Sequence, residues 1–175
     1  YRATPVTAVG GALRVPGDKS ISHRALLLGG ISAGTTRISG FLDSADCLAT
    51  LGALRALGVR IEQPGRHEVV IDGAGRSGLR ASAAPLDLGN AGTAIRLLMG
   101  LLAGQKFSST LIGDASLMRR PMERVALPLR LMGARIDTLD GHPPVLLQGG
   151  VPLTGIDYTL PVASAQVKSA LLLAG

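Results

Sequence analysis

An eight-residue pattern occurs twice in this chain of 175 residues. Residues 54–61 read Leu-Arg-Ala-Leu-Gly-Val-Arg-Ile, and residues 129–136 read Leu-Arg-Leu-Met-Gly-Ala-Arg-Ile. Both predict the end of a helix, a glycine that terminates it and the entry to a strand. A strongly apolar helix is predicted upstream of each occurrence of this pattern, near Arg24 and near Arg96, and a third such helix is predicted near Ala165. Because these helices recur at intervals of about seventy residues, we expect repeated units rather than unrelated elements.

Each copy has the predicted order strand, apolar helix, strand, amphipathic helix, strand, strand. The first copy, about 12–72, has its second helix over 45–57 and strands over 12–15, 35–39, 59–62 and 68–71. The second, about 85–148, has its second helix over 121–132, with Pro121 in the first turn, and strands over 85–88, 107–112, 134–138 and 145–148. A third copy opens with a strand over 156–160 and is truncated. Segments rich in Gly and Pro predict turns at 73–78, 141–144 and 149–152.

The first helix of each copy is apolar on nearly every face, which is typical of a helix buried all round. Aromatic residues make up only 2% of the chain, so the core is built from Leu, Val, Ile and Ala. We therefore expect an α/β (α+β) fold of βαβαββ units around a pseudo-threefold axis. Its apolar helices lie inside and its sheets outside, as an inside-out α/β barrel that forms most of one domain.

Composition excludes several classes of function. The net charge of +6 suits an anionic partner. We expect no nucleic acid, because stacking aromatics are scarce, and no membrane, because no apolar run approaches the ~20 residues of a spanning helix. No Cys/His cluster has metal-ligand spacing, so no metal site is expected. The single Cys47 and the lack of an export signal predict a cytoplasmic protein.

The segment 16–24, Pro-Gly-Asp-Lys-Ser-Ile-Ser-His-Arg, brings cations to a helix start. A turn delivers Lys19, Ser20 and Arg24 to the first turns of an apolar helix, whose N–H groups and dipole already favour an anion. Lysine supplies a point charge, and arginine a planar fork suited to phosphate or carboxylate. Asp18 separates Gly17 from Lys19, so the segment fails the P-loop pattern.

The repeat places related segments at the other helix starts. The second copy offers residues 88–96, Leu-Gly-Asn-Ala-Gly-Thr-Ala-Ile-Arg, in which Gly89 and Gly92 allow close approach of a ligand to the backbone. The third copy offers residues 163–166, Ala-Ser-Ala-Gln, and a fourth element, residues 113–121, carries Arg119 and Arg120. We expect the three helix starts to converge on one cleft.

Several of these residues also have ordinary structural interpretations. For Arg96 we favour an ion pair with Asp46 or Asp114 over contact with a ligand. Ser164 suits a helix cap better than a nucleophile, and Lys168 suits a buried or snorkelling position. His23 is expected to be hydrogen-bonded or exposed rather than catalytic.

Together, four motifs carry a resemblance over essentially the whole chain. They are the segments 16–28, 88–96, 113–122 and 163–175. In this order the chain resembles the 5-enolpyruvylshikimate-3-phosphate synthase family. The details are most similar to the branch with many glyphosate-tolerant bacterial enzymes, which commonly have Ala at the position of Gly92.

The resemblance implies transfer of the enolpyruvyl group of phosphoenolpyruvate to the 5-hydroxyl of shikimate 3-phosphate, with release of phosphate and no cofactor. It implies that Lys19 is the catalytic residue of this chain and touches both substrates. Residues implied for shikimate 3-phosphate are Ser20, Arg24, Ser164 and Ala165, with Gln166 near both substrates. Residues implied for phosphoenolpyruvate are Gly92 and Arg120. Supporting residues are Asp46, Asn90, Thr93 and Arg96. The family also implies a second domain, which supplies the carboxylates for proton transfer and is absent from this chain.

Two alternatives stay open at this point. The sister enzyme that transfers enolpyruvyl to UDP-N-acetylglucosamine shares the architecture, but usually has Lys-Asn where this chain has Lys19-Ser20. It also has a reactive loop cysteine, which Cys47 in a predicted helix matches poorly. The other alternative is a noncatalytic anion-binding domain.

Overall fold

Five α-helices and two β-sheets form the body of the computed structural model, which describes residues 2 and 4–175. The helices are α1 (Lys19–Ile31), α2 (Ala45–Ala56), α3 (Gly92–Ala103), α4 (Glu123–Leu131) and α5 (Ala165–Ala174). The first sheet contains β1 (Ala33–Ser39), β2 (Arg60–Gly65) and β3 (Glu68–Ala74). The second contains β4 (Leu86–Asp87), β5 (Ser109–Ile112), β6 (Arg135–Leu139) and β7 (His142–Gln148).

The two sheets share a three-stranded antiparallel arrangement, to which the second sheet adds the parallel strand β4. The first has the order β1-β3-β2 with all neighbours antiparallel, and the second has the order β4-β5-β7-β6. In both, the strand after the apolar helix pairs with the second strand of a hairpin, which lies in the middle of the sheet. The internal repeat in the sequence therefore corresponds to a repeated structural unit.

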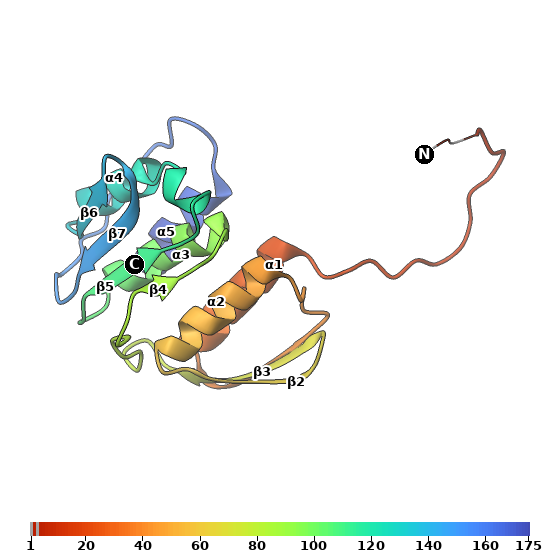
Figure 1. The fold of residues 1–175 in the computed structure, drawn as a ribbon, viewed down its shortest axis with the longest axis horizontal. Coiled ribbons are helices and arrows are strands. Elements are labelled where there is room, and N and C mark those ends of the chain that lie inside the picture. The colour runs from red at the N-terminus through yellow and green to blue at the C-terminus, as the bar shows by residue number, and fades with distance from the viewer. Residues whose placement is uncertain (1, 3) are drawn as a thin grey trace.

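Helix α3 is the centre of the core. Eleven of its residues are buried, and it contacts all four other α-helices. In Figure 1 helices α1, α2, α3 and α5 lie between the two sheets, as expected for apolar helices inside and sheets outside. Helices α3 and α5 lie close together at Gly100, where an added Cβ would lie 2.0 Å from the carbonyl oxygen of Ala170. No described helix is long and apolar enough to cross a bilayer.

Two predicted strands are wrong. Residues 12–15 form no strand, because the segment 4–15 is exposed and extends away from the body, where none of the described strands pairs with it (Figure 1). The matching strand of the second unit, β4, pairs in parallel with β5. Residues 156–160 also form no strand; instead, Ile156 and Leu160 pack half-buried against the core.

Two predicted boundaries are also wrong. Helix α4 begins at Glu123, so Pro121 precedes it rather than occupying its first turn. The backbone N–H of Met122 donates to the Gly141 carbonyl at 2.7 Å, which holds this segment outside the helix. Strand β7 begins at His142 and so includes most of the predicted turn at 141–144, because it pairs with β6 from its first residue.

Candidate anion-binding site

Lys19 stands at the first position of α1, on the turn that the sequence singles out. Asp18 caps the helix, and its Oδ1 accepts a hydrogen bond from the Ile21 N–H at 2.8 Å. The Lys19 ammonium lies 2.8 Å from Oδ2 of Asp46, in the first turn of α2. Because half of the Lys19 side chain is exposed, the ammonium is pre-oriented yet accessible to an anion.

A second bond joins α1 to α2 one turn further along. Nδ1 of His23 lies 2.7 Å from Oγ1 of Thr50, and both residues are buried. Desolvation, with smaller contributions from Lys19 and Arg24, lowers the pKa of His23 to about 4, although Asp46 opposes this. The imidazole is therefore neutral at neutral pH, and it fixes the helix that presents Lys19.

Arg24 connects α1 to α5. Its Nε and Nη2 donate to Oγ of Ser169 at 3.2 and 2.7 Å, and Nη2 also reaches the Ala165 carbonyl at 3.4 Å. Its Nη1 donates to the Ser20 carbonyl at 3.0 Å, while the Ser20 residue itself is exposed. The guanidinium thus brings the starts of two predicted anion-binding helices together.

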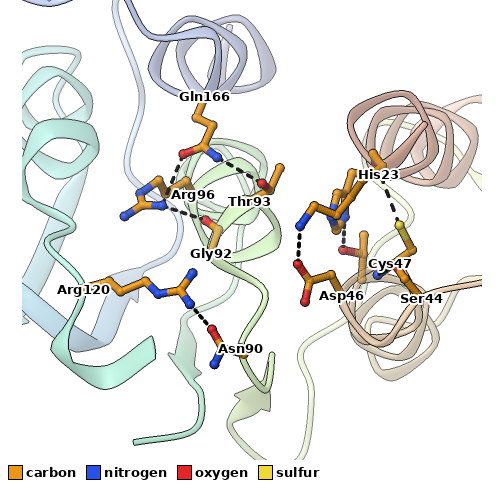
Figure 2. A network of polar contacts seen from close by, with 12 residues as sticks. His23, Ser44, Asp46, Cys47, Asn90, Gly92, Thr93, Arg96, Arg120 and Gln166 are labelled. Atoms are coloured by element: carbon orange, nitrogen blue, oxygen red, sulfur yellow. Dashed lines mark hydrogen bonds and ion pairs between the residues drawn. The ribbon is translucent and has the colours of Figure 1, made fainter. Parts of the chain in front are cut away.

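The first turn of α5 also reaches α3. Ser164 caps α5 and accepts from the Val167 N–H at 3.3 Å, as expected for a cap. Nε2 of Gln166 donates to Oγ1 of Thr93 at 3.0 Å, and its Oε1 accepts from Nη1 of Arg96 at 3.2 Å (Figure 2). All three helix starts are therefore joined by side-chain hydrogen bonds.

The expected ion pair of Arg96 is wrong. Arg96 donates to the carbonyls of Gly92 at 3.2 Å and Pro121 at 3.0 Å, besides Gln166, and within the described part of the chain it has no carboxylate partner. Asp46 is engaged by Lys19. Asp114 accepts from two backbone N–H groups in the turn that follows it, which lowers its pKa.

Gly92 lies between two guanidinium groups at the start of α3. A Cβ added there would lie 2.7 Å from Nη1 of Arg120 and 3.1 Å from Nη1 of Arg96. Arg120 donates to Oδ1 of Asn90 in the loop before α3 (Figure 2). Among the described residues no side chain caps α3; the Gly92 N–H donates to the Asn90 carbonyl at 2.9 Å, and Nη1 atoms of both Arg120 and Arg96 lie beside Gly92. This arrangement suits a phosphate or carboxylate.

Sequence reasoning missed two members of this arrangement. Ser169 receives Arg24, and Thr50 receives His23. A signal for Thr50 exists: it follows His23 by 27 residues, as Asp46 follows Lys19, so two equal spacings indicate paired helices. Lys168, expected to be buried or snorkelling, is exposed on α5 instead. Within residues 2 and 4–175, no cluster of three His, Cys, Asp or Glu could hold a metal ion.

Comparison with known proteins decides the family. The family model of EPSP synthase (3-phosphoshikimate 1-carboxyvinyltransferase) matches residues 3–175. The chain belongs to the EPSP synthase family. It is 60% identical over 176 residues to the 3-phosphoshikimate 1-carboxyvinyltransferase of Methylococcus capsulatus, and 61% identical to that of Alkalilimnicola ehrlichii. In both cases the match covers the whole chain and 40% of the relative.

A solved structure supports the same assignment. The EPSP synthase of Acinetobacter baumannii is 57% identical and superposes with a TM-score of 0.92 over 94% of this chain and 38% of that one. The predicted inside-out α/β fold of the EPSP synthase family is therefore confirmed. The chain spans about 40% of the length of the curated relatives that it matches.

Proposed function

We propose that this chain supplies part of the substrate site of a transferase in the shikimate pathway of aromatic amino-acid biosynthesis. The enzyme transfers the enolpyruvyl group of phosphoenolpyruvate to the 5-hydroxyl of shikimate 3-phosphate. A bond forms between the 5-oxygen and C2 of phosphoenolpyruvate, the bond from C2 to the phosphate oxygen breaks, and inorganic phosphate leaves with the hydroxyl proton. The observation that carries the proposal is the joining of three helix starts by Arg24 and Gln166.

Each substrate is assigned to one part of this arrangement. Lys19 contacts both substrates and is the catalytic residue contributed by this chain; it stabilises negative charge as phosphate leaves. The residues for shikimate 3-phosphate are Ser20, Arg24, Ser164 and Ala165. The residues for phosphoenolpyruvate are Gly92 and Arg120, and Gln166 lies near both. Asp46, Asn90, Thr93 and Arg96 support them, and their contacts with Lys19, Arg120 and Gln166 favour this role.

The chain cannot complete this reaction with the residues assigned here. We propose that it forms most of one domain, with copies at about 12–72 and 85–148 and a third starting near 156. A second domain would supply the carboxylates that move the hydroxyl proton, and further cations for phosphoenolpyruvate. The buried, unpaired Cys47 supports a reducing cytoplasm as the location.

The test uses a chimera in which this chain replaces the matching 40% of the Methylococcus capsulatus relative. We expect the chimera to release phosphate from phosphoenolpyruvate only when shikimate 3-phosphate is present. In calorimetric titration it should bind shikimate 3-phosphate and not UDP-N-acetylglucosamine. Binding of the nucleotide sugar alone would overturn the proposal, and binding of shikimate 3-phosphate without turnover would support a noncatalytic anion-binding domain instead.

Two variants make the test specific to this chain. Replacing Lys19 or Arg24 by Ala removes a cation from the proposed shikimate 3-phosphate site. Each should weaken binding of that ligand by about tenfold or more, since a charge-assisted hydrogen bond contributes roughly 1.5–3 kcal/mol. Arg135, which is exposed on β6, is the control, and its replacement by Ala should leave the affinity unchanged. Unchanged affinity in both site variants would remove the proposed site.

A further inference from the structure

Arg96 is a buried cation surrounded by other cations. It is 5% exposed, and its three polar partners are two backbone carbonyls and the amide oxygen of Gln166. Its Nε has no partner among the described residues. Burial, together with Arg124 and Arg120, lowers its pKa to about 10. A buried charge without an opposite charge is costly, so the position calls for a role that a neutral side chain would not fill.

The contacts of Arg96 determine which way the Gln166 amide faces. Arg96 has only donors, so it must bind the oxygen of the amide and cannot bind the nitrogen. The nitrogen of Gln166 then faces Thr93 and donates to its hydroxyl oxygen at 3.0 Å. With Arg96 removed, both orientations of the amide could hydrogen-bond to Thr93, because a hydroxyl donates as well as accepts.

The orientation also has a consequence for Thr93. Because its oxygen accepts from Gln166, its own proton remains free to be donated elsewhere. Thr93 is half-buried in the uncapped first turn of α3, beside Gly92. A hydroxyl proton there adds a donor to the N–H groups of the helix start, where the phosphate or carboxylate of phosphoenolpyruvate would lie.

We propose that Arg96 is a positioning residue, which acts on phosphoenolpyruvate through the fixed orientation of Gln166 and the hydroxyl of Thr93. The inference rests on the proposed function, since it names the substrate that benefits. Arg96 itself is too deeply buried to cover the ligand, and it links its own helix, α3, to the segment before α4 through Pro121 and to α5 through Gln166.

A double-mutant cycle in the chimera tests this chain of contacts. The variants are Arg96→Gln, Gln166→Ala and the two together, assayed for kcat and for the KM of each substrate. We expect Arg96→Gln to raise the KM for phosphoenolpyruvate by about tenfold, and the KM for shikimate 3-phosphate by less than about threefold. In the Gln166→Ala background, the same substitution should have little further effect, because residues that act through one another are not additive.

The control variant replaces an arginine that also donates a hydrogen bond to a glutamine. Arg135 donates to Oε1 of Gln148 at 3.5 Å on the exposed side of β6, so Arg135→Gln removes an equivalent pair away from the site. It should leave both KM values unchanged. Thr93→Val should reproduce the rise in KM for phosphoenolpyruvate, whereas Thr93→Ser, which keeps the hydroxyl, should restore most of the affinity.

The outcomes separate the two proposals. A chimera that is folded by circular dichroism but inactive with its natural residues contradicts the proposed function. An active chimera in which Arg96→Gln is equally damaging with and without Gln166 overturns the positioning role, and points to a structural one. If Arg96→Gln does not fold, Arg96→Lys keeps the charge without the fork, and the same cycle with Gln166→Ala gives the answer; additive effects there also overturn the proposal.

Discussion

A single methyl group at position 92 would lie too close to two guanidinium groups. The added Cβ of an Ala would lie 2.7 Å from Arg120 and 3.1 Å from Arg96, so the flexible end of Arg120 would have to move. At the residue scale, the absence of a side chain at Gly92 is therefore what keeps the proposed phosphoenolpyruvate site open.

The first prediction concerns Gly92→Ala. We expect it to raise the KM for phosphoenolpyruvate in the chimera by about tenfold, equivalent to about 1.4 kcal/mol, through displacement of Arg120. The matched control is Gly52→Ala in α2, where an added Cβ meets nothing within 4 Å. Steady-state kinetics would contradict the prediction if the two variants gave the same KM.

His23 yields a prediction about pH. Its pKa is about 4 in the folded chain and 6.5 in the unfolded chain, so the unfolded state binds a proton first as pH falls. The contribution of neutral His23 to the free energy of unfolding should therefore be fully present above pH 6.5. It should decrease by roughly 3 kcal/mol between pH 6.5 and pH 4. His23→Asn, whose amide can still reach Thr50 but does not titrate, should remove this decrease. Urea unfolding at several pH values measures both slopes, and equal slopes would contradict the assignment.

At the scale of single elements, a helix cap can change the stability of the protein without changing its affinity for substrate. Ser44 caps α2 and accepts from the Cys47 N–H at 3.4 Å, and α2 carries Asp46 and Thr50, which hold α1. Unlike Ser164, Ser44 has no proposed contact with substrate.

We therefore predict that Ser44→Ala lowers the free energy of unfolding by about 1 kcal/mol, because α2 loses its cap. Ser44→Asp, another good cap, should restore most of it. The affinity for shikimate 3-phosphate should change little once the protein is folded. Urea unfolding and calorimetry measure the two quantities, and a large loss of affinity with unchanged stability would show that Ser44 binds ligand after all.

The helices and strands show which features of the fold can be predicted from the sequence and which cannot. The repeat, the apolar helices and both hairpins could be predicted, since hydrophobic periodicity and terminating glycines are local signals. The strands over 12–15 and 156–160 could not be judged in this way, because a strand also depends on a neighbouring strand with which to pair. The partners of Arg96 were mispredicted for a similar reason: backbone carbonyls at Gly92 and Pro121 leave no signal in a sequence, whereas aspartates do.

The last prediction concerns the activity of the chain as a whole. The proposed proton-transfer carboxylates lie outside this chain, so the isolated 175 residues should give no measurable turnover with both substrates. The chimera, assayed in parallel for phosphate release, is the positive control. Product formed by the isolated chain would show that its own residues complete the reaction, and would refute the division of labour proposed above.

The close approach of α3 and α5 at Gly100 has a consequence for how activity can be lost. Gln166 reaches Thr93 and Arg96 because these two helices lie close together, and Gly100 makes that spacing possible two turns away from the site. A larger residue at position 100 would press on the backbone of Ala170 and spread the helices. A screen for inactive variants should therefore recover substitutions at Gly100, an uncharged core position with no proposed contact to substrate. In such variants every site residue would be present, but Gln166 would no longer reach Thr93 and Arg96.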